Sequence, residues 1–210
     1  MKHLNKSQKS ILLIVLFCGI LQLIRVQYTQ SLFFSFLLWN LFLACIPYIL
    51  SEVMKKSSLT KTKIIIGTSF WLLFLPNAPY MITDFIHLHQ SKSTMIWYDL
   101  FMIFCFANTG LLLSIVSMHT IYKIIQKNWT LTIANHFIIG VVFLCGFGIY
   151  LGRFLRFNSW DIFTTPLQTL KQSLTSFTNQ NAWFVSIGFG SLLWIMFSLY
   201  KTLKIVNEEK

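Results

Sequence analysis

The sequence predicts an all-α polytopic membrane protein, and its composition, its charge pattern and the lengths of its apolar runs all indicate this class. Of its 210 residues, 55% are hydrophobic and only 11% are charged, whereas soluble domains carry about 25% charged residues. A soluble fold of this size could not hide so much apolar surface, because small domains leave much of their surface in water. The composition therefore excludes a soluble enzyme, a disordered chain and a disulfide-stabilised secreted module.

Six segments are long and apolar enough to cross a bilayer, which takes about 20 mostly apolar residues. We expect these spans at about residues 11–28, 32–51, 64–83, 97–118, 133–152 and 182–203. The first resembles a signal peptide, but no small-residue cleavage site follows it, so we interpret it as an uncleaved span. Its Gln22, Arg25 and Gln27 are expected to reach up to the interface. Without repeats or low-complexity tracts, residues 1–210 form a single predicted domain.

The charge pattern predicts which way the spans run. The net charge is +11, and lysines cluster between spans as they do in cytoplasmic loops, not as on a nucleic-acid-binding surface. With the N-terminus inside, the inner loops carry most of the basic residues, so we predict that both termini are cytoplasmic. The outer side then holds all the aspartates and all the arginines, with two lysines: Asp84, Asp99, Asp161, Arg25, Arg153, Arg156, Lys92 and Lys171. The inner acidic residues are Glu52, Glu208 and Glu209.

The third span contains the least ordinary motif of the chain. Pro76 and Pro79 each remove a backbone donor and clash with the preceding turn, so the helix is expected to break there. The backbone groups freed within a membrane must be satisfied by protein or by a wet cavity, and broken helices line binding sites in transporters. Asn77 could cap a short helix after the break.

Asp84 and His87 follow the break three residues apart and so share a helix face. Three interpretations stay open: an interfacial hydrogen bond in a kinked helix, a substrate or proton site, and a metal site completed by His89. Asp84 and His87 are the candidate catalytic residues. We assign no metal and no cofactor to the chain.

The end of the fifth span carries Arg153 and Arg156, whose spacing lets both point at one target. Guanidinium groups bind phosphate and carboxylate bidentately, which indicates an anion site. The alternative is that the three outer arginines pair with the three outer aspartates and fasten helix ends together. Glycines 140, 146, 148 and 152 give the same span a small-residue face for close packing. Asn40, in the second span, is expected to form an interhelical hydrogen bond.

Residues 160–181 have apolar side chains at helical spacing, with Pro166 suited to a first turn. The apolar positions are Phe163, Leu167, Leu170, Leu174 and Phe177. This pattern favours an amphipathic helix lying on the outer membrane surface over a lid. The four cysteines lie inside apolar segments without zinc-site spacing, and we interpret them as buried apolar residues.

Several of these motifs together resemble a known family. They are the runs Trp39–Ala44, Leu75–Tyr80, Thr83–Leu88, Trp97–Asp99, Gly152–Arg156 and Asn158–Asp161. They resemble bacterial membrane proteins of the domain of unknown function 1361 family, from about residue 30 to 200, and the proline–asparagine motif is the specific part. The resemblance implies a bacterial polytopic membrane protein and implies no activity.

Our leading hypothesis is recognition of a polar or anionic ligand, such as a lipid head group or an envelope precursor, at the outer face of a bacterial cytoplasmic membrane. The site would comprise the candidate catalytic residues Asp84 and His87 and the candidate ligand-binding residues Asn77, Asp99, Arg153, Arg156, Asn158 and Asp161. This hypothesis assumes that three outer motifs lie close together in space: the segment from Pro76 to His87, the start of the fourth span at Trp97–Asp99, and the segment from Arg153 to Asp161. The alternatives are a small secondary transporter with Asp84 as proton carrier, and a non-catalytic accessory subunit. Whether the protein is an enzyme stays open, as do its protein partners beyond the lipid bilayer.

Overall fold

The computed structural model describes residues 5–90 and 95–208. Lys92 and Glu209, which the charge analysis assigns to opposite sides of the membrane, lie outside the described residues. The described part of the chain contains helices and no strands, and six of its helical segments are long and apolar enough to span a membrane. The predicted fold class and the predicted number of spans are therefore confirmed, while the orientation stays a prediction.

Five spans are single helices and one is segmented. The single helices are α1 (Lys6–Thr29), α2 (Phe36–Lys56), α5 (Ile96–Asn128), α6 (Leu131–Phe154) and α9 (Gln180–Glu208). The third span consists of α3 (Lys61–Phe74), the short α4 (Asn77–Tyr80) and the 3-10 helix η1 (Met81–Gln90). Two further helices, α7 (Asp161–Thr164) and α8 (Pro166–Ser176), connect α6 to α9.

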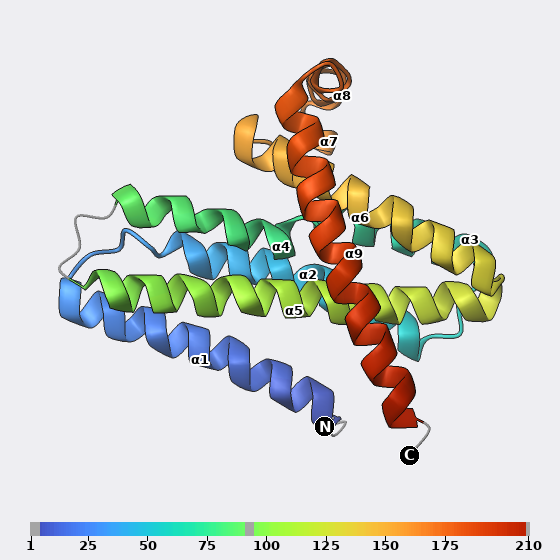
Figure 1. Cartoon of the computed structure of the whole chain (residues 1–210), viewed down its shortest axis with the longest axis horizontal. Coiled ribbons are helices and arrows are strands. Elements are labelled where there is room, and N and C mark those ends of the chain that lie inside the picture. Colours follow the sequence, from blue (N-terminus) through green and yellow to red (C-terminus); the bar gives the residue numbers. More distant parts are fainter. Residues whose placement is uncertain (1–4, 91–94, 209–210) are drawn as a thin grey trace.

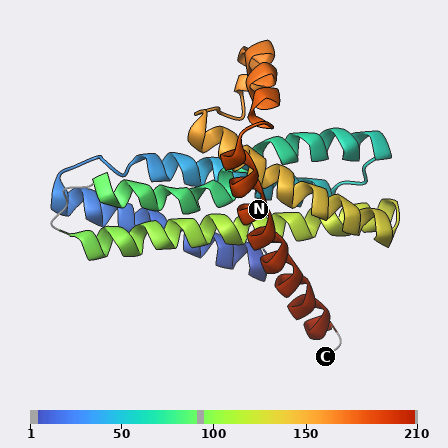
Figure 2. The same ribbon diagram turned by 45° about the horizontal axis from the view of Figure 1, so that its top comes forward.

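Helix α5 is the centre of the bundle. The other long elements α1, α2 and α3 to η1 run along it, whereas α9 crosses their direction and packs mainly against α6 (Figures 1 and 2). One buried apolar cluster joins α5 to α3, α6 and α9 around Trp71, Met118 and Val142. A second joins it to α1, α2 and the segments after the break, around Leu37 and Phe106.

Local sequence fixes where several helices begin. Asn5 caps α1, because its side chain accepts from the Gln8 backbone N–H at 2.8 Å while the Gln8 side chain accepts from the Asn5 N–H. Thr60 and Thr130 cap α3 and α6, each accepting from a backbone N–H three residues later.

The third span changes geometry twice within a few residues. Helix α3 ends at Phe74, and a turn over Leu75 and Pro76 leads into α4. Pro76 occupies the cap position of α4 and makes no side-chain cap hydrogen bond, so the expectation that Asn77 caps this helix is wrong. The Asn77 amide instead donates back to the Phe74 carbonyl at 2.9 Å, an acceptor that would otherwise lack a helical partner.

The segment between α6 and α9 forms two helices where one was expected. Thr165, which precedes Pro166, has φ −136° and ψ 59°, outside the helical region, because the proline ring disfavours helical geometry in the preceding residue. The predicted apolar positions are all exposed: Phe163, Leu167, Leu170, Leu174 and Phe177. Helices α7 and α8 project from the bundle at the end of α6 (Figure 1). Phe163 stacks on Phe70 and Phe177 stacks on Phe147, so Leu167, Leu170 and Leu174 are the part of this face that is available to a membrane surface.

Candidate functional site

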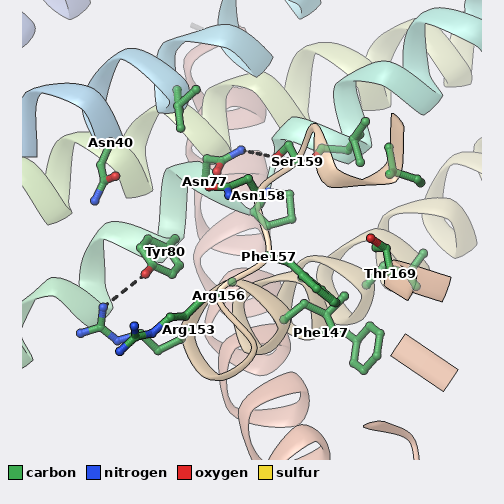
Figure 3. Close-up of a pocket in the computed structure, with 18 of the residues that line it drawn as sticks. Asn40, Asn77, Tyr80, Phe147, Arg153, Arg156, Phe157, Asn158, Ser159 and Thr169 are labelled. Atoms are coloured by element: carbon green, nitrogen blue, oxygen red, sulfur yellow. Dashed lines mark hydrogen bonds between the residues drawn. The ribbon is translucent and has the colours of Figure 1, made fainter. Parts of the chain in front are cut away.

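A cavity of about 660 Å³ lies between α2, the segmented third span, α6 and the segment that follows α6. Its polar lining comprises Asn40, Asn77, Tyr80, His87, Arg153, Arg156, Asn158, Ser159 and Thr169. Its remaining lining is largely apolar, including Leu43, Leu72, Leu144 and Phe147. We call it the arginine cavity, because Arg153 and Arg156 project into it in the same direction from the end of α6 (Figure 3).

Arg153 is the centre of the polar network. One guanidinium nitrogen donates to the Tyr80 hydroxyl at 3.2 Å and the other donates to the Thr83 carbonyl at 3.0 Å. Both lie within 3.4 Å of His87 Nε2. Because a guanidinium group has only donors, His87 Nε2 is the acceptor in these two contacts.

Asp84 lies behind Arg153 and does not line the cavity. Its side chain is buried, and its Oδ2 accepts a 2.9 Å hydrogen bond from the Asn40 amide. That bond joins α2 to η1 and confirms the interhelical hydrogen bond expected of Asn40. Asp84 Oδ1 lies 3.8 Å from Arg153 and has no hydrogen-bond partner among the described residues.

The 3-10 geometry of η1 explains how Asp84 and His87 both reach Arg153. With three residues per turn, side chains three positions apart eclipse one another. The guanidinium group therefore meets the carboxylate and the imidazole on one face of η1. The Asp84 carboxylate accepts a hydrogen bond from Asn40 on α2.

Arg156 is held in an uncommon backbone conformation at the cavity. Its φ of 58° is left-handed, a region that is costly for a residue with a side chain. The turn lets the Phe157 N–H bond back to the Leu151 carbonyl at 3.2 Å. Arg156 is exposed, and no described acidic side chain lies within ion-pair distance of it.

The loop after Arg156 is hydrogen-bonded to the third span on either side of Pro76. Ser159 accepts from the Asn77 amide at 2.8 Å and donates to the Leu73 carbonyl at 3.1 Å. Asp161 does not line the cavity; it accepts from the Asn158 backbone N–H at 2.8 Å and so shapes the loop. The hydrogen bond from Asn77 to Ser159 is visible in Figure 3.

Two glycines allow α6 to approach the break closely. A Cβ built on Gly148 would lie 2.5 Å from Pro76 Cγ, and one on Gly152 would lie 3.3 Å from the Tyr80 ring. Gly146 instead faces α9, where a Cβ would meet the Ser186 backbone at 2.6 Å. Nothing lies within 4 Å of the corresponding position at Gly140. The small-residue face of this span therefore serves two neighbours and leaves one glycine open.

Asp99 belongs to a different part of the molecule. It forms an ion pair with Arg25 at 3.1 Å, between α5 and α1, and both side chains are buried. Arg25 also donates to the Ser31 carbonyl at 2.9 Å and lies over the Phe34 ring. The expectation that Arg25 and Gln22 reach the interface is wrong, since both are buried, and a carboxylate inside the bundle offers Arg25 a partner that lipid does not.

Two of the three outer motifs converge, and the third does not. Asn77, His87, Arg153, Arg156 and Asn158 line the arginine cavity, whereas Asp84, Asp99 and Asp161 do not. Tyr80, Asn40 and Ser159 also line it and were not assigned to the site from the sequence. The position of Tyr80, directly after Pro79, was the available signal, because backbone groups that prolines free within a span must have protein or a wet cavity beside them.

The donor set suits an anion better than a metal. Guanidinium and amide N–H groups dominate the polar lining, and these donate to phosphate or carboxylate oxygens. Among residues 5–90 and 95–208, no group of three or more His, Cys, Asp or Glu side chains is placed to hold a metal ion.

Comparison with curated proteins and with solved structures yields no match for this chain. Comparison with protein families does yield one, and it spans both converging motifs. The family, described as "Protein of unknown function (DUF1361)", matches residues 39–196, which is most of the chain and runs from α2 into α9. The chain therefore belongs to the DUF1361 family of proteins of unknown function.

Proposed function

We propose that this membrane protein recognises an anionic group, a phosphate or a carboxylate, in the arginine cavity. The observation that carries the proposal is Arg156, an exposed cation in the cavity lining with no described acidic partner. A lone arginine held in a left-handed backbone conformation costs stability. An incoming anion would give its guanidinium group the bidentate partner that the described protein lacks.

The neighbouring groups support the same ligand chemistry. Arg153 is fixed in place by Tyr80 and Thr83, so it adds positive charge without having to be reordered on binding. Its own acidic partner stands 3.8 Å away and outside the cavity lining. We further propose that the cavity opens to the outer side of a bacterial cytoplasmic membrane, with a lipid head group or an envelope precursor as the natural ligand.

Binding of an anionic lipid to Arg156→Ala protein in nanodiscs tests the proposal. Because a charge-assisted hydrogen bond is worth about 1.5–3 kcal/mol, affinity for phosphatidic acid should fall roughly tenfold or more in this variant. Lys171→Ala is the matched control, since it removes an exposed positive charge from α8 that does not line the cavity. Equal losses in both variants, or no loss in either, would mean that only the general positive charge of the protein attracts anions.

Proton-coupled transport is the second candidate, because one oxygen of the buried Asp84, on the segmented third span, has no hydrogen-bond partner among the described residues. It predicts solute flux in proteoliposomes that follows a pH gradient and disappears in Asp84→Asn protein. The catalytic roles of Asp84 and His87 stay predictions. His87 lines the cavity, but its Nε2 lone pair is already directed at Arg153.

A further inference from the structure

A second, smaller cavity lies next to the arginine cavity, between α3, the end of α5 and the start of α6. Its volume is about 240 Å³, and its lining includes Ile65, Thr68 and Leu72 from α3, Trp129 after α5, and Ile133 and Phe137 from α6. Leu72 also lines the arginine cavity. The two cavities therefore share one lining residue.

One face of α6 runs from the one cavity to the other. Ile133, Phe137, Leu144 and Leu151 follow helical spacing and all line one or the other cavity. Gly140 falls on the same face between them, is exposed, and would meet nothing within 4 Å if it carried a Cβ. We call this strip of the surface the α3–α6 seam, bounded by Ile65, Leu72, Phe137 and Gly140.

The packing of the helices determines what lies beneath the seam. Helix α3 packs mainly against α2, and α6 packs mainly against α9 and α5, while Trp71 of α3 and Phe137 of α6 pack against each other beneath the seam. Figure 2 shows the two helices running along the same end of α5. The seam borders are exposed hydrophobic side chains, with Ile65 at 58% and Ile133 at 46%, so the seam faces hydrocarbon in a membrane.

The chemistry along this path changes from polar to apolar in one direction. Arg153 and Arg156 lie at one end, and the other end is lined by aliphatic and aromatic residues. Along α6, about 20 Å separates Arg153 from Gly140 and about 30 Å separates Arg153 from Ile133 at 1.5 Å per residue, so a lipid tail reaches the Gly140 end of the seam first. The polar exceptions in the seam are small: Ser69 bonds its own helix backbone, and the buried Thr68 hydroxyl has no described partner.

We propose that the anion held in the arginine cavity is the head group of a long-chain lipid whose hydrocarbon tail lies in the α3–α6 seam. The inference rests on the proposed function, because the head group provides the anchor. A tail gains no hydrophobic free energy by moving from lipid to protein, only packing contacts. Occupancy of the seam must therefore depend on the arginines, and a soluble anion would leave the seam unexplained.

Photo-crosslinking in nanodiscs tests this placement. The probe is long-chain phosphatidic acid with a diazirine at the end of one tail, diluted in phosphatidylcholine. We expect labelled peptides to map to the end of the seam nearer the arginines, at Leu72, Gly140 and Leu144. In Gly140→Leu protein the new side chain occupies the open position on this face of α6. This labelling should therefore fall roughly tenfold, which corresponds to about 1.4 kcal/mol of binding free energy.

Two further variants make the result decisive. Gly188→Leu is the matched control, because Gly188 is an equally open, exposed glycine on α9, and its labelling should equal that of wild type. Arg153→Ala/Arg156→Ala protein should lose the seam label together with phosphatidic acid binding. Circular dichroism and gel filtration establish that each variant is folded.

Each contrary outcome has its own meaning. Label spread evenly over all lipid-facing helices, or retained in the double arginine variant, would show that the seam holds any neighbouring lipid and overturns the inference. If short-chain phosphatidic acid binds as tightly as the long-chain form and both need the arginines, the proposed function stands and the tail placement fails. If neither binds wild type, the proposed function itself fails.

Discussion

Two arginine–aspartate pairs in this bundle use the same residue types in different ways. Arg25 lies 3.1 Å from Asp99, and the two side chains are 3% and 0% exposed. Arg153 lies 3.8 Å from Asp84, and its side chain stays 18% exposed beside the arginine cavity. The first pair joins α1 to α5 and is buried on all sides, whereas the second leaves its guanidinium group facing the arginine cavity.

The difference separates a structural role from a binding role. The remaining contacts of Arg25 are the Ser31 carbonyl and the Phe34 ring, which complete a sealed site. Those of Arg153 include Tyr80 and His87, which line the arginine cavity. A closed pair behaves as expected for helix fastening, the role of an accessory subunit, while an open pair is arranged to receive a further partner.

Breaking the sealed pair should have the largest effect on stability. Arg25→Met leaves Asp99 buried without a cation, and an uncompensated buried charge typically costs about 3–5 kcal/mol. Thermal unfolding in detergent should show this loss, and a smaller one for Arg153→Met, because the Asn40 amide still donates to Asp84 in that variant. Arg25→Met/Asp99→Leu should recover most of the stability. Equal losses for the two single variants would remove the distinction between the pairs.

Gly148→Ala should disturb the Arg153–Asp84 pair indirectly, through the contact between α6 and Pro76. Its effect on stability should be intermediate. The added Cβ would lie 2.5 Å from Pro76 Cγ, and overpacking of this kind costs about 1–3 kcal/mol. Moving α6 away from the break also moves Arg153 away from Tyr80, so anion binding should weaken together with stability. Gly140→Ala is the control, since its Cβ meets nothing and helix propensity should raise stability by up to about 1 kcal/mol.

The membrane class and the spans follow from sequence because both depend on run length and composition alone. The converging motifs were also visible: Pro76 marks the break, and Arg153 and Arg156 oppose the charge bias of the loops. Which aspartate meets which arginine was not predictable, because it depends on the order of helices in space. Arg25 shows the consequence, since hydropathy places it at the interface and only its neighbour Asp99 explains its burial.

Arg156→Gly should change the stability least, and the direction of that change is the most informative result. Glycine adopts the left-handed conformation at φ 58° without steric cost, so the free energy of unfolding should rise, by less than about 1 kcal/mol once the added freedom of the unfolded chain is counted. Affinity for phosphatidic acid should fall in the same protein, because the unpaired guanidinium group is lost. Parallel thermal unfolding and nanodisc binding measure the two effects. A variant that loses stability would show that Arg156 contributes to packing, whereas opposite changes mean that this position is kept for its ligand at the expense of the fold.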